Sequence, residues 1–167
     1  MVAAGPAVIE YRRAFRFGAP PEFVWETLER TGEFERWWGW LGEFRLDGAG
    51  LEAGAVLIGV VSPPVPYRMR VRVELEECVR PSRIEAAVHG DLEGRARLEL
   101  APDGEGTVAS VAWTIEMRQR RMRMAARVAY PLLRWGHDRV VDATVFGFRR
   151  QLTASGGGRR PDPPPTP

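Results

Sequence analysis

The chain has 167 residues, of which 44% are hydrophobic and 10% aromatic, which is enough for one domain with a sizeable core. Its net charge of +2 arises from 24 arginines and 22 acidic residues, without any lysine, and the two signs interleave in segments such as residues 70–77. This pattern argues against a nucleic-acid-binding stripe, and a single cysteine, Cys78, excludes an internal disulfide.

The two ends of the chain differ in composition from the middle. We expect a flexible N-terminus over residues 1–7, one domain over residues 8–153, and a disordered Gly/Arg/Pro-rich tail over residues 154–167. No segment approaches the ~18 uninterrupted apolar residues of a membrane span, and the N-terminus lacks the pattern of a signal peptide. A cytoplasmic protein, either monomer or homodimer, is therefore expected.

The first predicted elements are one strand and two short helices. Residues 8–17 alternate in hydrophobicity, as a strand with one buried face does, and the sequence Gly18-Ala19-Pro20-Pro21 ends that strand. Proline is tolerated in the first helical turn, so residues 21–30 are predicted to form a short helix. A second, shorter helix is predicted from Thr31 toward Trp37 and Trp38.

Six further strands are predicted at residues 42–47, 54–62, 67–77, 82–89, 92–100 and 107–118. In the clearest of these, Tyr67, Met69, Val71, Val73 and Leu75 share one face, and charged residues occupy the other. One wet face and one buried face indicate an antiparallel sheet. Residues 103–106 are typical of a hairpin turn between the last two strands.

A long amphipathic helix is predicted over residues 122–152. Pro131 lies inside its pattern and should bend the helix without ending it. His137 falls in the middle of the apolar stripe, on the same side as Tyr130, Leu133, Thr144 and Phe148.

This order of elements resembles the helix-grip fold of the START-like (SRPBCC) superfamily. Three parts of the chain are similar to its polyketide cyclase/dehydrase branch: residues 14–17 with 20–25, residues 88–94, and Gly106-Thr107 with Trp113 and residues 130–138. The resemblance covers residues 8–152. It implies an α+β fold in which a curved, seven-stranded antiparallel sheet wraps around the long C-terminal helix, with two short helices after the first strand.

The resemblance also implies a deep apolar cavity between sheet and helix. In various members this cavity holds lipids, sterols, plant hormones or polyketide chains, and some members catalyse ring closure and dehydration whereas others only bind. Catalytic residues differ from member to member, so the resemblance assigns none here. It implies only that His137 lies at a helix position that faces the cavity.

His137, Thr144 and Tyr130 would place three hydrogen-bonding groups on an otherwise apolar helix face, as a pocket that orients a small molecule requires. A structural role, in which each polar tip bonds a backbone group or a buried water, is an equal alternative for His137. In an enzyme, His137 is the candidate base and Tyr67 the candidate proton donor for aldol closure of a polyketide-like carbonyl compound.

Aromatic and apolar residues complete the predicted site. Trp38 and Trp40 are expected at the cavity mouth, whereas core packing is the simpler interpretation of Trp37 and Trp113. The residues predicted to contact the ligand are Tyr11, Trp38, Trp40, Met69, Trp113, Tyr130, Leu133, Thr144 and Phe148.

No cofactor and no metal are expected, because the two histidines lie on different elements and there is only one cysteine. His89 opposes the apolar residues of its strand and is expected at the surface. The arginines between Arg118 and Arg134 fit peripheral contact with a membrane or a carrier protein, although a solvated helix face explains them more simply.

The sequence thus predicts a protein that binds a hydrophobic small molecule, polyketide-like or lipid. It acts either as a cofactor-independent polyketide cyclase/dehydratase that uses His137 or, alternatively, as a non-catalytic carrier or sensor of a lipid or hydrophobic metabolite.

Overall fold

A computed structural model describes residues 8–156, except for the side chains of residues 122 and 125–128. The predictions for residues 1–7 and 157–167 lie outside this described part. The C-terminal helix continues to Gly156, so residues 154–156 form part of it and do not begin a tail.

Seven strands form one antiparallel sheet in the described chain, in the order β1-β7-β6-β5-β4-β3-β2. Every neighbouring pair is antiparallel, and the strand positions predicted from hydrophobic alternation are confirmed to within three residues at each end. The strands are β1 (Val8–Phe17), β2 (Leu41–Asp47), β3 (Val56–Val61), β4 (Met69–Val79), β5 (Arg83–Gly90), β6 (Leu92–Asp103) and β7 (Gly106–Met117).

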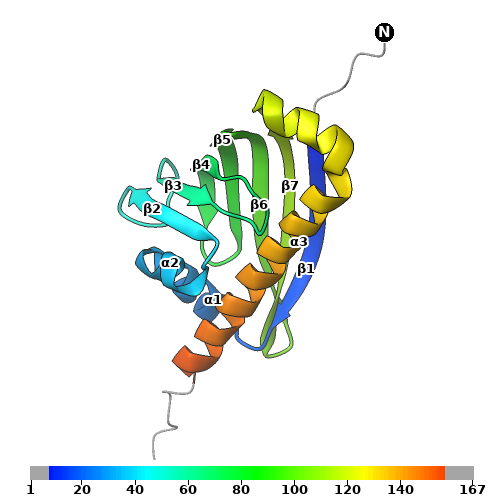
Figure 1. Ribbon diagram of the computed structural model, residues 1–167. Coiled ribbons are helices and arrows are strands. Elements are labelled where there is room, and N and C mark those ends of the chain that lie inside the picture. The colour runs from blue at the N-terminus through cyan, green and yellow to red at the C-terminus, as the bar shows by residue number, and fades with distance from the viewer. Residues whose placement is uncertain (1–7, 157–167) are drawn as a thin grey trace, which may run out of the picture.

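The short helices lie between β1 and β2 in sequence. They are α1 (Pro21–Leu28), the 3₁₀ helix η1 (Thr31–Glu33) and α2 (Phe34–Trp37). The long helix α3 (Arg120–Gly156) runs across the concave face of the sheet, and α1 and α2 pack beside its C-terminal half (Figure 1). The predicted helix-grip architecture is therefore confirmed.

The predicted bend in the long helix is also confirmed. Ala129 has non-helical backbone angles (φ −119°, ψ 27°), two residues before Pro131. Proline lacks the N–H that would close a helical hydrogen bond, and its ring clashes with the preceding turn, so the deviation falls just before it. The bend turns the first part of α3 over the edge of the sheet where β1 begins (Figure 1).

Aromatic residues form much of the largest buried cluster in the described chain. Phe34, Trp37 and Trp38 from α2 and its end meet Phe17 of β1 and Phe148 of α3. Gly147 permits this close packing, because a Cβ atom at that position would lie 2.6 Å from the Trp37 carbonyl oxygen. A smaller cluster of Met69, Met117 and Leu133 lies nearer the start of α3.

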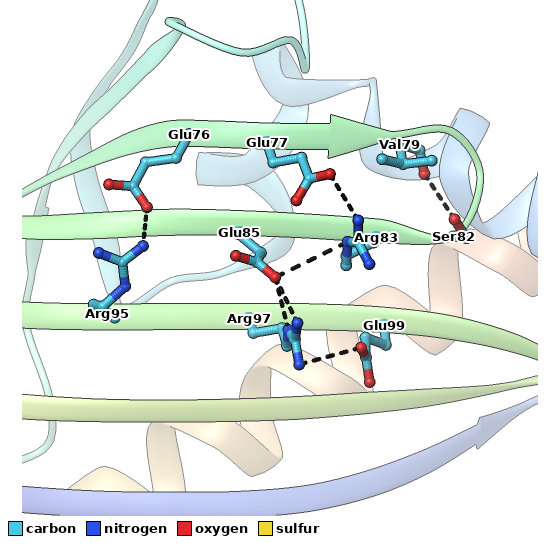
Figure 2. Close-up of polar contacts among 9 residues, drawn as sticks. All are labelled: Glu76, Glu77, Val79, Ser82, Arg83, Glu85, Arg95, Arg97 and Glu99. Carbon is cyan, nitrogen blue, oxygen red and sulfur yellow. Dashed lines mark hydrogen bonds and ion pairs between the residues drawn. The ribbon is translucent and has the colours of Figure 1, made fainter.

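The face of the sheet turned away from α3 carries cross-strand ion pairs (Figure 2). Glu76 pairs with Arg95, Arg83 lies 2.7 Å from Glu77, and Arg97 lies 2.6 Å from Glu85. His89 joins the same face as a half-exposed side chain 3.1 Å from Glu93. Exposed pairs contribute at most ~1 kcal/mol each, so this face is solvated, as its alternating charges predict.

Candidate functional site

A cavity of about 430 Å³ lies between the concave face of the sheet and α3. Small-molecule sites commonly enclose roughly 300–1,000 Å³ behind mostly apolar walls with a few polar groups. The wall here is almost wholly apolar, with side chains from several strands, α1 and α3, and from the segments before β2 and β4. It includes Ile9, Phe15, Leu28, Val61, Leu98, Ala109, Val111, Ile115, Met117, Val140, Val141 and Val145.

Most of the residues predicted to contact a ligand lie on this wall: Trp38, Trp40, Met69, Trp113, Leu133, Thr144 and Phe148. Both predicted catalytic residues, His137 from α3 and Tyr67 from the segment before β4, line the same cavity. The structure thus brings these side chains together around one space, and their roles in binding or catalysis stay predictions.

His137 sits in an aromatic corner formed with Tyr11 and Trp113. Its ring lies edge-on to both, with centroid distances of 5.0 Å to Tyr11 and 5.4 Å to Trp113. Nδ1 lies 3.3 Å from Oδ1 of Asp138, whereas Nε2 is buried and has no hydrogen-bond partner among the described residues. A carboxylate beside Nδ1 favours the tautomer with its hydrogen on Nδ1, which leaves the Nε2 lone pair as an acceptor.

Asp138 is the functional candidate that the sequence pattern missed. Consecutive residues on a helix do not share a face, so helical periodicity places Asp138 on the polar side and His137 on the apolar side. The short side chain of Asp138 nevertheless reaches the edge of the neighbouring imidazole. The His-Asp dipeptide itself was the only signal that could have indicated this contact.

Tyr11 does not line the cavity and borders a groove between β1 and α3 instead. Its ring stacks on Trp113 with a centroid distance of 4.4 Å, and its hydroxyl is buried with no hydrogen-bond partner in the described residues. Direct contact with a ligand in the cavity would therefore require a side-chain movement. In the present arrangement Tyr11 holds Trp113 and His137 in place.

Tyr67 precedes β4, which begins at Met69 instead of the predicted residue 67. Its side chain still faces the cavity, next to the proline-rich segment that contributes Pro63. Burial raises the pKa of the Tyr67 phenol because the phenolate would lose solvation. The hydroxyl therefore keeps its proton near neutral pH and can act as a donor.

Thr144 and the two tryptophans line the cavity and also have contacts outside it. The Thr144 hydroxyl donates to the Val140 carbonyl at 2.7 Å, so its proton is used within the helix. Trp38 is buried, and its indole N–H donates to the Thr144 carbonyl at 3.0 Å. Trp38 therefore belongs to the hydrophobic core and also lines the cavity. Trp40 stacks on Trp38, and its buried indole N–H has no partner among the described residues.

The prediction that Tyr130 faces the cavity is wrong. Its side chain is 52% exposed and borders a separate groove between β1 and α3, with Val8, Arg134 and Asp138. The bend at Ala129 breaks the regular helical rotation, so the side on which Tyr130 falls cannot be extrapolated from Leu133.

No three His, Cys, Asp or Glu side chains gather as a metal site would require, in the part of the chain that the structure describes. None of the described helices combines the length and the hydropathy of a membrane-spanning segment.

A curved antiparallel sheet closed by a long C-terminal helix around an apolar cavity defines a helix-grip protein of the START-like superfamily. A family model described as polyketide cyclase / dehydrase and lipid transport matches residues 8–153. The chain belongs to this family.

Solved structures with little sequence identity share the fold. TTHA0849 from Thermus thermophilus is 16% identical with a TM-score of 0.72, over 88% of this chain and 99% of that one. The Zhui aromatase/cyclase from Streptomyces sp. R1128 is 13% identical with a TM-score of 0.71, over 92% and 99% of the two chains. A START superfamily protein from Mycobacterium smegmatis is 10% identical with a TM-score of 0.67, over 87% and 98%. A search of the curated proteins finds no match.

Proposed function

We propose that the protein binds a hydrophobic small molecule in the cavity between the sheet and α3, with a polar group of that molecule against Nε2 of His137. The observation that carries the proposal is that His137 lines a mostly apolar cavity and has a buried ring nitrogen with no hydrogen-bond partner among the described residues. An apolar wall supplies binding free energy by surface burial, and a single polar group sets the orientation of the guest.

The first test fills the cavity. Ala109 is buried on the inner face of β7, whereas Ala112 lies on the outer face of the same strand. We expect Ala109→Phe to abolish binding of the uncharged fluorescent probe N-phenyl-1-naphthylamine, and the matched control Ala112→Phe to bind it as the wild type does. Urea unfolding checks that both variants are folded. Equal probe binding by both variants would place the probe outside this cavity.

The second test concerns the polar group. We expect 2-naphthol to displace the probe at lower concentration than 2-methylnaphthalene, because its hydroxyl can donate to Nε2 of His137. A net hydrogen bond contributes about 0.5–1.5 kcal/mol, so the preference should be about two- to tenfold and should vanish in His137→Phe. Equal affinities in the wild type would remove the role of His137 and leave the cavity as a purely apolar site.

A second candidate function is the cyclase/dehydratase activity, which the Asp138-His137 pair favours. In an aldol closure, Nε2 would take the α-proton of a β-keto chain, and the resulting enolate carbon would form a bond to a ketone carbon. The Tyr67 hydroxyl would give its proton to the new alkoxide, and loss of water would complete the dehydration. The similarity to the Zhui aromatase/cyclase, which concerns the fold alone, is compatible with this chemistry.

The catalytic and the carrier alternatives make different kinetic predictions. With a poly-β-keto N-acetylcysteamine thioester as substrate, a catalytic base predicts that His137→Ala lowers kcat with little change in KM. Tyr67→Phe should also lower kcat if the phenol is the donor. A wild-type protein that binds the thioester without turnover, and whose His137→Ala variant binds it less tightly, would be a carrier or sensor.

A further inference from the structure

The solvent side of α3 carries an apolar and basic surface that the cavity does not use. We propose that this surface docks the protein peripherally on a bilayer with anionic headgroups, with α3 lying in the plane of the membrane surface. We define the outer stripe as Leu132, Trp135, Arg139, Phe146 and Arg150. The proposal is independent of the nature of the ligand in the cavity.

The outer stripe follows helical geometry. At about 100° per residue its five members fall within roughly 60° of each other on the helix circumference. Leu133, Val140 and Phe148 of the cavity side lie about 110° to 170° from the middle of the stripe. From Leu132 to Arg150 the stripe is about 27 Å long at 1.5 Å per residue. α3 is therefore apolar on two sides, one toward the cavity and one toward solvent.

Exposure of large apolar side chains is concentrated on this helix. Of the seven large hydrophobic residues exposed in the described chain, five belong to α3. Within the stripe, Leu132 is 48% exposed, Trp135 44% and Phe146 66%. Single exposed apolar residues need no explanation, but an aligned set on one helix face is typical of an interaction surface.

Arginines accompany the exposed rings. The guanidinium of Arg139 lies 5.6 Å from the ring centre of Trp135, and that of Arg150 lies 6.0 Å from that of Phe146. At a membrane surface, aromatic rings lie at the level of the headgroups, and arginine side chains beside them reach the phosphates.

Charge is distributed very unevenly along the sequence. Residues 118–150 contain nine arginines and two acidic residues, which gives a net charge of +7. Because the whole chain has a net charge of +2, the remaining residues together carry −5. The two acidic side chains are already engaged, since Asp138 lies against His137 and Asp142 lies 3.6 Å from Arg13. The chain as a whole is thus close to neutral, although α3 is strongly basic.

The arginines of this helix also differ in their partners. Eleven of the thirteen arginines that precede Arg118 lie within 4.0 Å of a carboxylate. None of the eight arginines between Arg118 and Arg150 whose side chains are described forms such a pair within the described residues. Their charge is therefore available to an external anion.

An anionic bilayer fits this surface better than a nucleic acid or a folded acidic protein. Leu132 and Phe146 cannot form hydrogen bonds with the phosphates or bases of a nucleic acid. The outer stripe is also straight, so all its residues can contact a flat membrane surface at the same time. Basic helices with apolar residues on the buried face bind at the headgroup boundary, and each arginine near an anionic surface contributes ~1 kcal/mol.

The test is co-sedimentation of the full chain with vesicles of phosphatidylcholine alone or with about 30% phosphatidylglycerol, at about 0.1 M sodium chloride. We expect binding to the anionic vesicles only. Loss of two arginines in Arg139→Gln/Arg150→Gln should weaken the partition by about tenfold or more. Loss of two apolar contacts in Trp135→Ala/Phe146→Ala should weaken it by about tenfold as well.

The matched control is Arg72→Gln/Val79→Ala, which removes an exposed arginine and an exposed valine from β4, away from the stripe. It should bind as the wild type does, and binding should be constant between about pH 6 and 9 because arginine stays charged there. Three results would overturn the proposal. The first is equal binding to neutral and anionic vesicles, and the second is an equal loss of vesicle binding in the control variant. The third is no vesicle binding together with self-association in gel filtration that depends on the outer stripe.

Discussion

His137 lies among apolar and aromatic side chains, which disfavour a polar group without a hydrogen-bond partner. Its Nε2 atom is buried without a partner among the described residues, and such a group costs about 1–3 kcal/mol. Phenylalanine is similar in size and has no polar atom, so His137→Phe is predicted to raise the free energy of unfolding in urea by about 1 kcal/mol. A lowered free energy of unfolding would show instead that the Asp138 contact stabilises the fold by more than the burial of Nε2 costs.

Cys78 provides a second prediction for a single residue. Burial raises the pKa of its thiol, and the carboxylates of Glu52 and Glu77 add to the shift by disfavouring a second negative charge nearby. Because the thiolate is the reactive form, we expect Cys78 to react with iodoacetamide at about pH 8 more slowly than free cysteine. Mass spectrometry measures this rate, and Glu52→Gln should increase it. A rate equal to that of free cysteine would contradict the shift.

Sequence reasoning located the candidate residues unevenly, for physical reasons. His137 could be placed by helical period because the helix is regular from Leu133 onward, whereas Tyr130 could not because it lies next to the bend. The Asp138 contact depends on the side-chain conformations of adjacent residues, which periodicity does not describe. The hydrogen bond of Thr144 to Val140 likewise depends on a rotamer, although this back-bond is common for threonine in helices.

Among the elements, α3 offers a matched pair of glycines. Replacing either Gly136 or Gly147 with alanine should gain up to ~1 kcal/mol of helix propensity. The new methyl group would lie 3.4 Å from a flexible methyl of Val65 at position 136, but 2.6 Å from the Trp37 carbonyl at position 147. Thermal unfolding should therefore show an unchanged or higher midpoint for Gly136→Ala. For Gly147→Ala it should show a lower midpoint, because the free energy of unfolding falls by about 1–3 kcal/mol. Two equal shifts would contradict this close contact.

Element positions were predictable because each element has a strong local signal. The strands alternate charged and apolar residues, and the turn at Gly104 and Glu105 between β6 and β7 has the composition of a tight hairpin. The end of α3 was less predictable, since residues 154–156 have no apolar member that must be buried. Strand order depends on contacts between distant segments, and local sequence signals did not predict it beyond the hairpin of the last two strands.

At the scale of the whole molecule, the cavity occupies a place where a core would otherwise be packed. A ligand that binds only the folded state should raise the unfolding temperature in proportion to the logarithm of its concentration. The stabilisation reaches about 2.7 kcal/mol at 100 times Kd. Calorimetry with N-phenyl-1-naphthylamine measures this, and Ala109→Phe should be insensitive to the probe. An equal shift in that variant would indicate binding elsewhere.

The open sheet also has a consequence for solubility. Its two outermost strands, β1 and β2, each leave one row of backbone groups free to pair with another chain. β2 interrupts this row with a register shift between Gly42 and Arg45, where Glu43 adopts a left-handed conformation (φ 51°), and β1 carries Arg12, Arg13 and Arg16. A bulge and a run of like charges both oppose the addition of a further strand, so both edges of the sheet disfavour edge-to-edge association between copies of the chain.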